Sequence, residues 1–128
     1  MKKGQPLRVL VADDNPSMRS AIQSVLTDVP NLEVCAVVSN GRDALDAALA
    51  LKPNLLIIDQ VMPGLSGVEV IGILKKSLPA AKFILFTMYE DSVGKFLRKF
   101  AGVDIVIEKS KGLTLLSEKI RSVMEQMQ

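Results

Sequence analysis

The sequence predicts an α/β fold in which a parallel sheet of five strands lies between two layers of helices. Short aliphatic runs alternate along the chain with segments whose apolar residues recur at helical spacing. The runs are almost continuously apolar, which is typical of strands covered on both faces. A helix after each strand implies right-handed crossovers between parallel strands. We therefore expect a doubly wound (βα)5 three-layer sandwich with the strand order 2-1-3-4-5, which is common for this topology.

The predicted elements follow one another from residue 7 to the end of the chain. The strands are expected at 7–12, 32–38, 55–58, 82–86 and 105–107. Each of the five helices carries one apolar stripe, namely Met18, Ile22, Val25 and Val29; Leu45, Ala48 and Leu49; Ile71, Leu74 and Leu78; Val93, Phe96, Leu97 and Phe100; and Leu116, Ile120, Val123 and Met127. Cap and turn residues mark helix ends: Pro16 after Asp14 or Asn15 begins the first, and Pro53-Asn54, Pro79 and Gly102 close the next three.

Length and composition indicate a single globular domain, which we assign to residues 1–128. A net charge of +2 is too small to predict nucleic-acid binding by this chain. The absence of histidine excludes histidine-based catalysis, histidine metal ligands and a phosphohistidine. The single cysteine, Cys35, cannot form an internal disulfide, and no apolar stretch approaches the roughly 20 residues that cross a bilayer. We therefore expect a cytoplasmic protein that does not contact membranes.

Polar residues follow every predicted strand at its carboxyl end, in the groups 13–15, 39–41, 59–61, 87–89 and 108–110. Sheets of this topology bind ligands beyond the carboxyl ends of their strands, so we expect the function at this edge. With the common strand order, the edge gathers three carboxylates, one hydroxyl and one ammonium group. These belong to Asp13, Asp14, Asp59, Thr87 and Lys109.

These residue types together suit phosphoryl chemistry at a magnesium ion. Carboxylates about 4 Å apart repel by roughly 4 kcal/mol at an effective dielectric near 20, and a cation relieves that repulsion. An all-oxygen ligand set favours Mg²⁺. A carboxylate beside Mg²⁺ can attack phosphorus to form an aspartyl phosphate, while Thr87 and Lys109 could bind phosphoryl oxygens. Taken singly, each residue has an ordinary alternative: helix caps for Asp13 and Asp14, a loop acid for Asp59, a strand residue for Thr87 and a solvated charge for Lys109.

Motifs at the strand ends, taken in order, resemble those of a known family. They are VADD at 11–14, LIID at 56–59, MPGLSG at 62–67, Thr87 and Lys109. The chain resembles the receiver (phospho-acceptor) domains of two-component response regulators and is similar to the stand-alone chemotaxis type. The resemblance extends from Leu7 to about Met127, and it implies a flavodoxin-like fold. Each motif is weak alone, whereas all of them in order are specific.

The resemblance implies a role for each matching residue. Asp59 would accept a phosphoryl group from a histidine kinase or phosphotransfer protein, or from a small donor such as acetyl phosphate. Asp14 and Asp59 would bind Mg²⁺ directly, Asp13 would bind it through water, and Val61 would bind it through its backbone carbonyl. The chain would be a phospho-acceptor that phosphorylates itself and loses the group slowly, rather than an enzyme that turns over a substrate.

The resemblance also implies how the signal is passed on. Thr87 and Lys109 would hold the phosphoryl group, and phosphorylation would shift the population toward an active arrangement. Partners would bind the surface of the fourth helix, fifth strand and fifth helix. That surface is made basic by Lys95, Arg98, Lys99, Lys111 and Lys119. We expect a downstream protein partner or a missing output domain, and a phosphorylation-dependent homodimer is a further prediction.

Three positions depart from the family pattern. Val106 stands where the family usually has an aromatic residue, so we expect backbone movement of residues 87–91 to carry more of the response. Ser110 replaces the proline that usually follows the lysine, and this replacement favours a trans peptide bond. Val61 offers no polar side chain to hold a hydrolytic water, which together with Tyr89 predicts slow loss of the phosphoryl group.

The main alternative is a degenerate receiver that acts as a phosphorylation-independent interaction module, and the departures at 61, 106 and 110 are its support. A flavodoxin-like cofactor binder is disfavoured, because the acids at 13–14 would repel phosphate and Pro16 lacks an N–H donor. An aspartyl phosphatase would need a second acid at position 15, where Asn15 stands.

Overall fold

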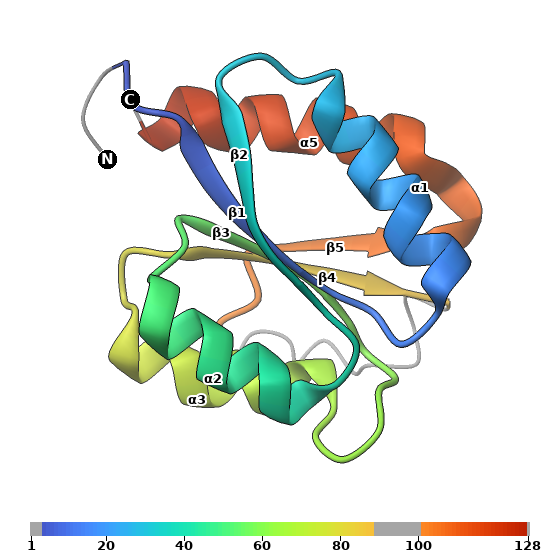
Figure 1. Cartoon of the computed structure of the whole chain (residues 1–128), viewed down its shortest axis with the longest axis vertical. Helices are drawn as coiled ribbons and strands as arrows, with labels where there is room; N and C mark the ends of the chain where they lie inside the picture. Colours follow the sequence, from blue (N-terminus) through green and yellow to red (C-terminus); the bar gives the residue numbers. More distant parts are fainter. Residues whose placement is uncertain (1–3, 89–100, 128) are drawn as a thin grey trace.

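A five-stranded parallel sheet forms the centre of the computed structural model, which describes residues 4–88 and 101–127 (Figure 1). Its neighbouring strands are parallel throughout, in the order β2-β1-β3-β4-β5. The strands are β1 (Leu7–Ala12), β2 (Leu32–Val38), β3 (Leu55–Asp59), β4 (Lys82–Thr87) and β5 (Ile105–Glu108). The predicted strand order is confirmed, and β3, β4 and β5 each run one residue beyond the predicted end.

Helices cover both faces of the sheet, as the doubly wound prediction requires. One face carries α1 (Pro16–Thr27) and α5 (Gly112–Met127), and the other carries α2 (Gly41–Leu51) and α3 (Gly67–Ser77) (Figure 1). A 3-10 turn, η2 (Lys109–Lys111), joins β5 to α5. The fourth predicted helix, with its stripe at 93–100, lies outside the described residues. None of the helices in 4–88 and 101–127 is long and apolar enough to cross a membrane.

Alternate side chains of the inner strands face two separate apolar cores. In β3, Leu56 and Ile58 pack toward α2 and α3, whereas Leu55 and Ile57 pack toward α1 and α5. Every residue of β3 is buried, which explains why a central strand has an unbroken apolar sequence. The edge strand β2 has no fully buried residue, although its side chains pack against the cores on both faces of the sheet, as expected. An edge strand has a neighbour on one side only, and its side chains keep contact with solvent.

The helix ends follow the predicted cap residues, with one error in an apolar stripe. Asn15 is the N-cap of α1, because its side chain accepts a hydrogen bond from Met18 N at 3.0 Å, and Pro16 is the first helical residue. In α2, Leu49 is 47% exposed, contrary to prediction. The buried residues of α2 are Gly41, Ala44, Leu45 and Ala48. The stripe therefore runs from position 41 to 48, and Leu49 falls at its edge.

Helix α3 begins in direct contact with the end of β3. Gly67, its first residue, donates a backbone hydrogen bond to the Gln60 carbonyl at 2.9 Å. A Cβ at Gly67 would lie 2.6 Å from the Asp59 carbonyl oxygen and 2.7 Å from Leu85 Cδ1. Since backbone and a packed core side chain both occupy that space, only glycine lets the helix approach β3 this closely.

Substitution of Gly67 by alanine should therefore destabilise the fold by about 1–3 kcal/mol, the usual cost of overpacking. Gly72 is a matched control in the same helix, because a Cβ there meets no atom within 4 Å. Gly72→Ala should stabilise the protein by about 0.5–1 kcal/mol, since alanine is the better helix former. Urea unfolding of the two variants measures both effects. Equal effects of the two substitutions would contradict the close approach of α3 to β3.

Candidate functional site

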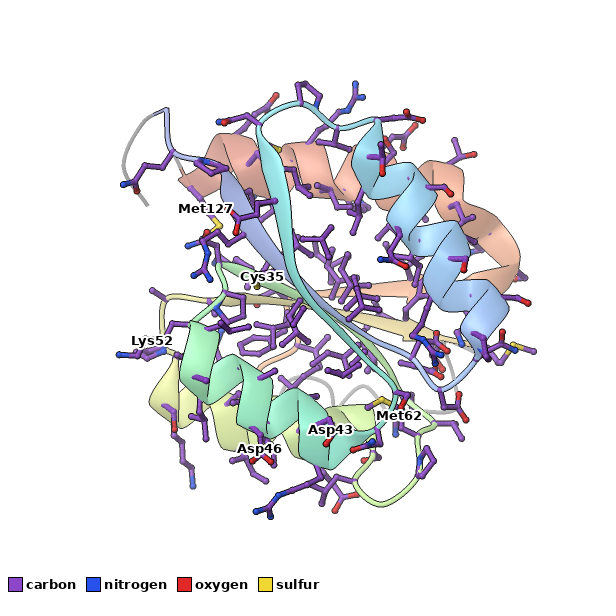
Figure 2. The ribbon with its side chains drawn as sticks, viewed as in Figure 1. Cys35, Asp43, Asp46, Lys52, Met62 and Met127 are labelled. Carbon is purple, nitrogen blue, oxygen red and sulfur yellow. The ribbon has the colours of Figure 1, made fainter. Side chains whose placement is uncertain are left out.

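The carboxyl ends of four neighbouring strands bring the predicted site residues to one edge of the sheet. In Figure 2, Met62 marks this end of the molecule and Lys52 marks the opposite end. Because β1, β3, β4 and β5 are adjacent and parallel, the residues that end or follow them come close together. These residues are Asp13 after β1, Asp59 at the end of β3, Thr87 at the end of β4 and Lys109 after β5.

Three carboxylates form an acidic cluster at this edge. One oxygen from each of Asp13, Asp14 and Asp59 lies within 4.8 Å of the other two. Asp13 is completely buried and Asp59 is 4% exposed, whereas Asp14 is exposed. The cluster is therefore closed on the side of the sheet and open to solvent at Asp14.

Hydrogen bonds to the end of β2 and to the start of α1 hold the buried Asp13 in place. Its N–H donates to the Val38 carbonyl at 3.1 Å, and its Oδ1 accepts a hydrogen bond from Asn15 N at 2.9 Å. Its carbonyl accepts from Arg19 Nη1 at 2.8 Å, a contact that the sequence did not single out, although Arg19 stands one turn after the cap. The other carboxylate oxygen, Oδ2, is buried and, among the residues that the structure describes, accepts no hydrogen bond; it forms an ion pair with Lys109.

Lys109 is the counter-ion of two carboxylates. Its Nζ lies 3.1 Å from Asp13 Oδ2 and 3.2 Å from Asp59 Oδ2. The side chain is only 11% exposed, and Nζ lies 5.9 Å from the centre of the Phe86 ring. The alternative of a solvated surface charge is therefore wrong for this lysine. Sequence reasoning placed Lys109 at the edge of the sheet but did not predict that it bridges these two acids.

The pKa of Asp59 is raised above its ordinary value. Burial is the largest cause, since it disfavours the charged carboxylate, and the negative charge of Asp13 acts in the same direction. Lys109 and the backbone N–H of Val61, which lies 3.4 Å from Asp59 Oδ1, lower the pKa but do not cancel the increase. Asp59 is therefore a carboxylate whose charge is incompletely compensated.

The residues of the cluster fit a divalent cation. Every ligand atom in the cluster is a carboxylate oxygen, which favours a hard ion such as Mg²⁺. Three ionised carboxylates and one ammonium group leave a formal charge of −2, which a divalent cation would balance. Asp13 Oδ2 agrees with this fit, because it is buried and its counter-ion, Lys109, is shared with Asp59.

The remaining predicted site residues surround this cluster. Thr87 is buried at the end of β4, whereas the Val61 side chain is 71% exposed beyond β3. Val106 is half-buried and packs against the core on the α2 and α3 side of the sheet. The bond between Lys109 and Ser110 is trans, as the replacement of proline predicted.

Part of the predicted partner surface can be placed. Lys111 is exposed in η2, and Lys119 is half-buried in α5. The other predicted members of that surface are Lys95, Arg98 and Lys99. These three residues and Tyr89 lie outside the described residues. The basic character of the surface therefore stays a prediction.

Comparison with known proteins gives one consistent result at the level of sequence. The family model of the response regulator receiver domain matches residues 9–121. The response regulator protein VraR of Staphylococcus saprophyticus is 33% identical over 116 residues, which cover 91% of this chain and 56% of that protein. The response regulator GacA of Pseudomonas aeruginosa is 32% identical over 117 residues, which cover 91% and 55%. The chain thus spans about half the length of these relatives.

Solved structures agree in fold. The response regulator domain of Thermotoga maritima CheB is 28% identical, with a TM-score of 0.82, over 94% of this chain and 98% of that one. A DNA-binding response regulator of the LuxR family from Staphylococcus aureus is 26% identical, with a TM-score of 0.84, over 91% and 98%. Both similarities therefore extend over more than nine-tenths of this chain.

The raised pKa of Asp59 predicts that the metal-free protein loses stability as the pH rises. The folded state holds the Asp59 proton more tightly than the unfolded state, where the carboxyl titrates near 3.8. This contribution is fully present below that value and is lost as the pH rises through the folded pKa. In EDTA, the unfolding temperature of the wild type should fall relative to Asp59→Asn as the pH rises from 3.8 through the raised pKa of Asp59 in the folded protein. If the unfolding temperatures of the two proteins changed in parallel with pH, the pKa of Asp59 would not be raised in the folded state.

Proposed function

Since the chain belongs to the response regulator receiver domain family, we propose that it is a phospho-acceptor of a phosphorelay, with Asp59 as the acceptor. The observation that carries this proposal is the buried Asp59 carboxylate, which lies among two further acids and contacts Lys109. A degenerate receiver, used only as an interaction module, has no need to bury an ammonium group between two carboxylates. The intact cluster therefore favours phosphoryl chemistry over that alternative.

Mg²⁺ is the cation that we assign to the cluster. Asp14 and Asp59 would be direct ligands, Asp13 would act through water, and Val61 would contribute its backbone carbonyl. This assignment is supported by the all-oxygen donor set and by the exposure of Asp14, which leaves a path for a hydrated ion. When bound, the ion supplies positive charge to the phosphoryl oxygens.

The chemical step is the transfer of a phosphoryl group from the donor atom to the Asp59 carboxylate. A carboxylate oxygen of Asp59 forms a bond to phosphorus while the bond from phosphorus to the donor breaks. The donor atom that leaves with the electron pair is a histidine nitrogen of a kinase or phosphotransfer protein, or an acetate oxygen of acetyl phosphate. Asp59 must be ionised to attack, so its raised pKa makes nearby positive charge a requirement.

Lys109 and Thr87 would hold the transferred group. The ammonium group of Lys109 is in contact with the Asp59 carboxylate, so a phosphoryl group on Asp59 would lie close to this ammonium group. A charge-assisted hydrogen bond from Lys109 and a hydroxyl hydrogen bond from Thr87 would then bind two phosphoryl oxygens. Lys109 would have to weaken its contact with Asp13 to do so, which links the chemistry to the end of β5.

Signalling would follow from that change of partners. Phosphorylation shifts the population only to the extent that the active arrangement binds the phosphoryl group better. The surface of β5 and α5, together with the helix that the sequence predicts before β5, would then be bound by a downstream partner, an output domain or a second copy of the chain. An output domain agrees with the relatives, whose chains are nearly twice as long as the matched region.

The proposal predicts that wild-type protein with Mg²⁺ and excess acetyl phosphate gains one phosphoryl group, a mass increase of about 80 Da. Asp59→Asn should show no increase, because it lacks the attacking carboxylate. Asp46→Asn is the control, since Asp46 is exposed on α2 and forms a surface ion pair with Arg42. Intact-mass spectrometry separates these results. Equal labelling of Asp59→Asn and wild type would place the acceptor elsewhere.

The exposed, apolar side chain of Val61 predicts slow loss of the phosphoryl group. Val61→Asn would place an amide beside Asp59 that can hold and orient an attacking water, so it should speed dephosphorylation several-fold. Val61→Ala is the matched control, because it shortens the side chain without adding a polar atom, and its rate should stay near that of the wild type. The decay of labelled protein after removal of the donor measures the rates. Acceleration by both variants would mean that access to the site, rather than water orientation, sets the lifetime.

A further inference from the structure

The first turn of α3 has four backbone N–H groups that need acceptors outside the helix. A reciprocal capping box satisfies two of them, because Ser66 Oγ accepts from Glu69 N at 3.3 Å and Glu69 Oε1 accepts from Ser66 N at 3.0 Å. Gln60 satisfies the other two. Its carbonyl accepts from Gly67 N at 2.9 Å, and its side-chain Oε1 accepts from Val68 N at 3.0 Å.

Gln60 is also the residue between Asp59 and Val61. Its own N–H donates to the Phe86 carbonyl of β4 at 3.3 Å. Backbone and side chain of this one residue are therefore bonded both to the neighbouring strand and to the start of α3. The residues on either side of Gln60 carry the two groups in question, the Asp59 carboxylate and the Val61 carbonyl, so these hydrogen bonds restrict how both groups can move.

We propose that Gln60 is a positioning residue, whose side-chain bond to Val68 sets the geometry in which Asp59 and the Val61 carbonyl meet the metal. This inference rests on the function proposed above. Mg²⁺ requires nearly ideal octahedral geometry, so a small displacement of one ligand weakens its binding. Loss of the Gln60 side-chain acceptor would free the segment between β3 and α3, and the separation of the two ligands would vary.

A purely structural role of Gln60 as a helix cap can be separated from this positioning role. Gln60→Met removes the side-chain acceptor and keeps the length of the side chain. Ser66→Ala removes another side-chain acceptor from the same turn. The Ser66 hydroxyl accepts from Glu69 N and is not bonded to the segment that carries Asp59. Both variants should lower the unfolding temperature by a comparable amount, because each leaves one N–H of α3 without its acceptor.

The experiment is a Mg²⁺ titration of the full ¹⁵N-labelled chain, followed by the amide signals of Asp14 and Val61. Gln60→Met should weaken Mg²⁺ binding about tenfold, the lower end of the range found for residues that orient metal ligands. Ser66→Ala should bind Mg²⁺ as the wild type does, and the Val61 amide should shift in the metal-free spectrum of Gln60→Met only. If Gln60→Met fails to fold, Gln60→Asn, which keeps the amide but withdraws it from Val68, should give the same result.

Two outcomes would overturn the inference. One is equal Mg²⁺ affinity of the wild type and the folded Gln60 variant, and the other is equal weakening by the Gln60 and Ser66 variants, which would assign the effect to the helix end. Wild-type protein that binds no Mg²⁺ would instead overturn the proposed function. The two failures are therefore distinguishable in one set of titrations.

Discussion

The repulsion among three carboxylates at one edge of a parallel sheet governs the chemistry of this site. Two of them, Asp13 and Asp59, are almost entirely shielded from water, so solvent can do little to screen their charges. At a separation of about 4 Å and an effective dielectric near 20, each ionised pair costs roughly 4 kcal/mol. The sheet enforces this proximity, because β1 and β3 are adjacent and their ends are in register. Burial of Asp59 is the largest cause of its raised pKa, and the nearby charge of Asp13 raises it further.

Lys109 offsets this electrostatic repulsion only in part. One ammonium group contacts both buried acids, yet it leaves net negative charge for a cation to balance. A phosphoryl group on Asp59 would compete with Asp13 for the same ammonium. Because Lys109 directly follows β5, a change in its partners would be felt at the end of that strand and at the start of α5. Under the proposed function, this connection would link phosphorylation of Asp59 to the end of β5 and the start of α5.

The sequence predicted those features that depend on local pattern and on general topology rules. Aliphatic runs marked the strands, and the common order of a doubly wound sheet placed Asp13, Asp59, Thr87 and Lys109 at one edge. Features that depend on surroundings were missed. Leu49 falls at the margin of a stripe, where helical periodicity alone does not decide burial.

Contacts made by long side chains could not be predicted from the sequence either. The two ion pairs of Lys109 and the hydrogen bond from Arg19 to the Asp13 carbonyl depend on rotamers that only packing selects. Gln60 gave no signal either, because its role arises where the start of α3 meets the end of β3, eight residues apart in sequence. The family motif pointed to its neighbours Asp59 and Val61, whereas the inferred role of Gln60 depends on a tertiary hydrogen bond to Val68.

The account is tested most directly by a crystal structure of the chain with Mg²⁺ and beryllofluoride, an analogue of the phosphoryl group. We expect the metal at about 2.1 Å from the carboxylates of Asp14 and Asp59 and from the Val61 carbonyl. We also expect beryllium on Asp59 and the Lys109 ammonium moved from Asp13 to a fluorine. A metal bound away from the three acids, or Lys109 still bridging Asp13 and Asp59 beside the analogue, would contradict the account.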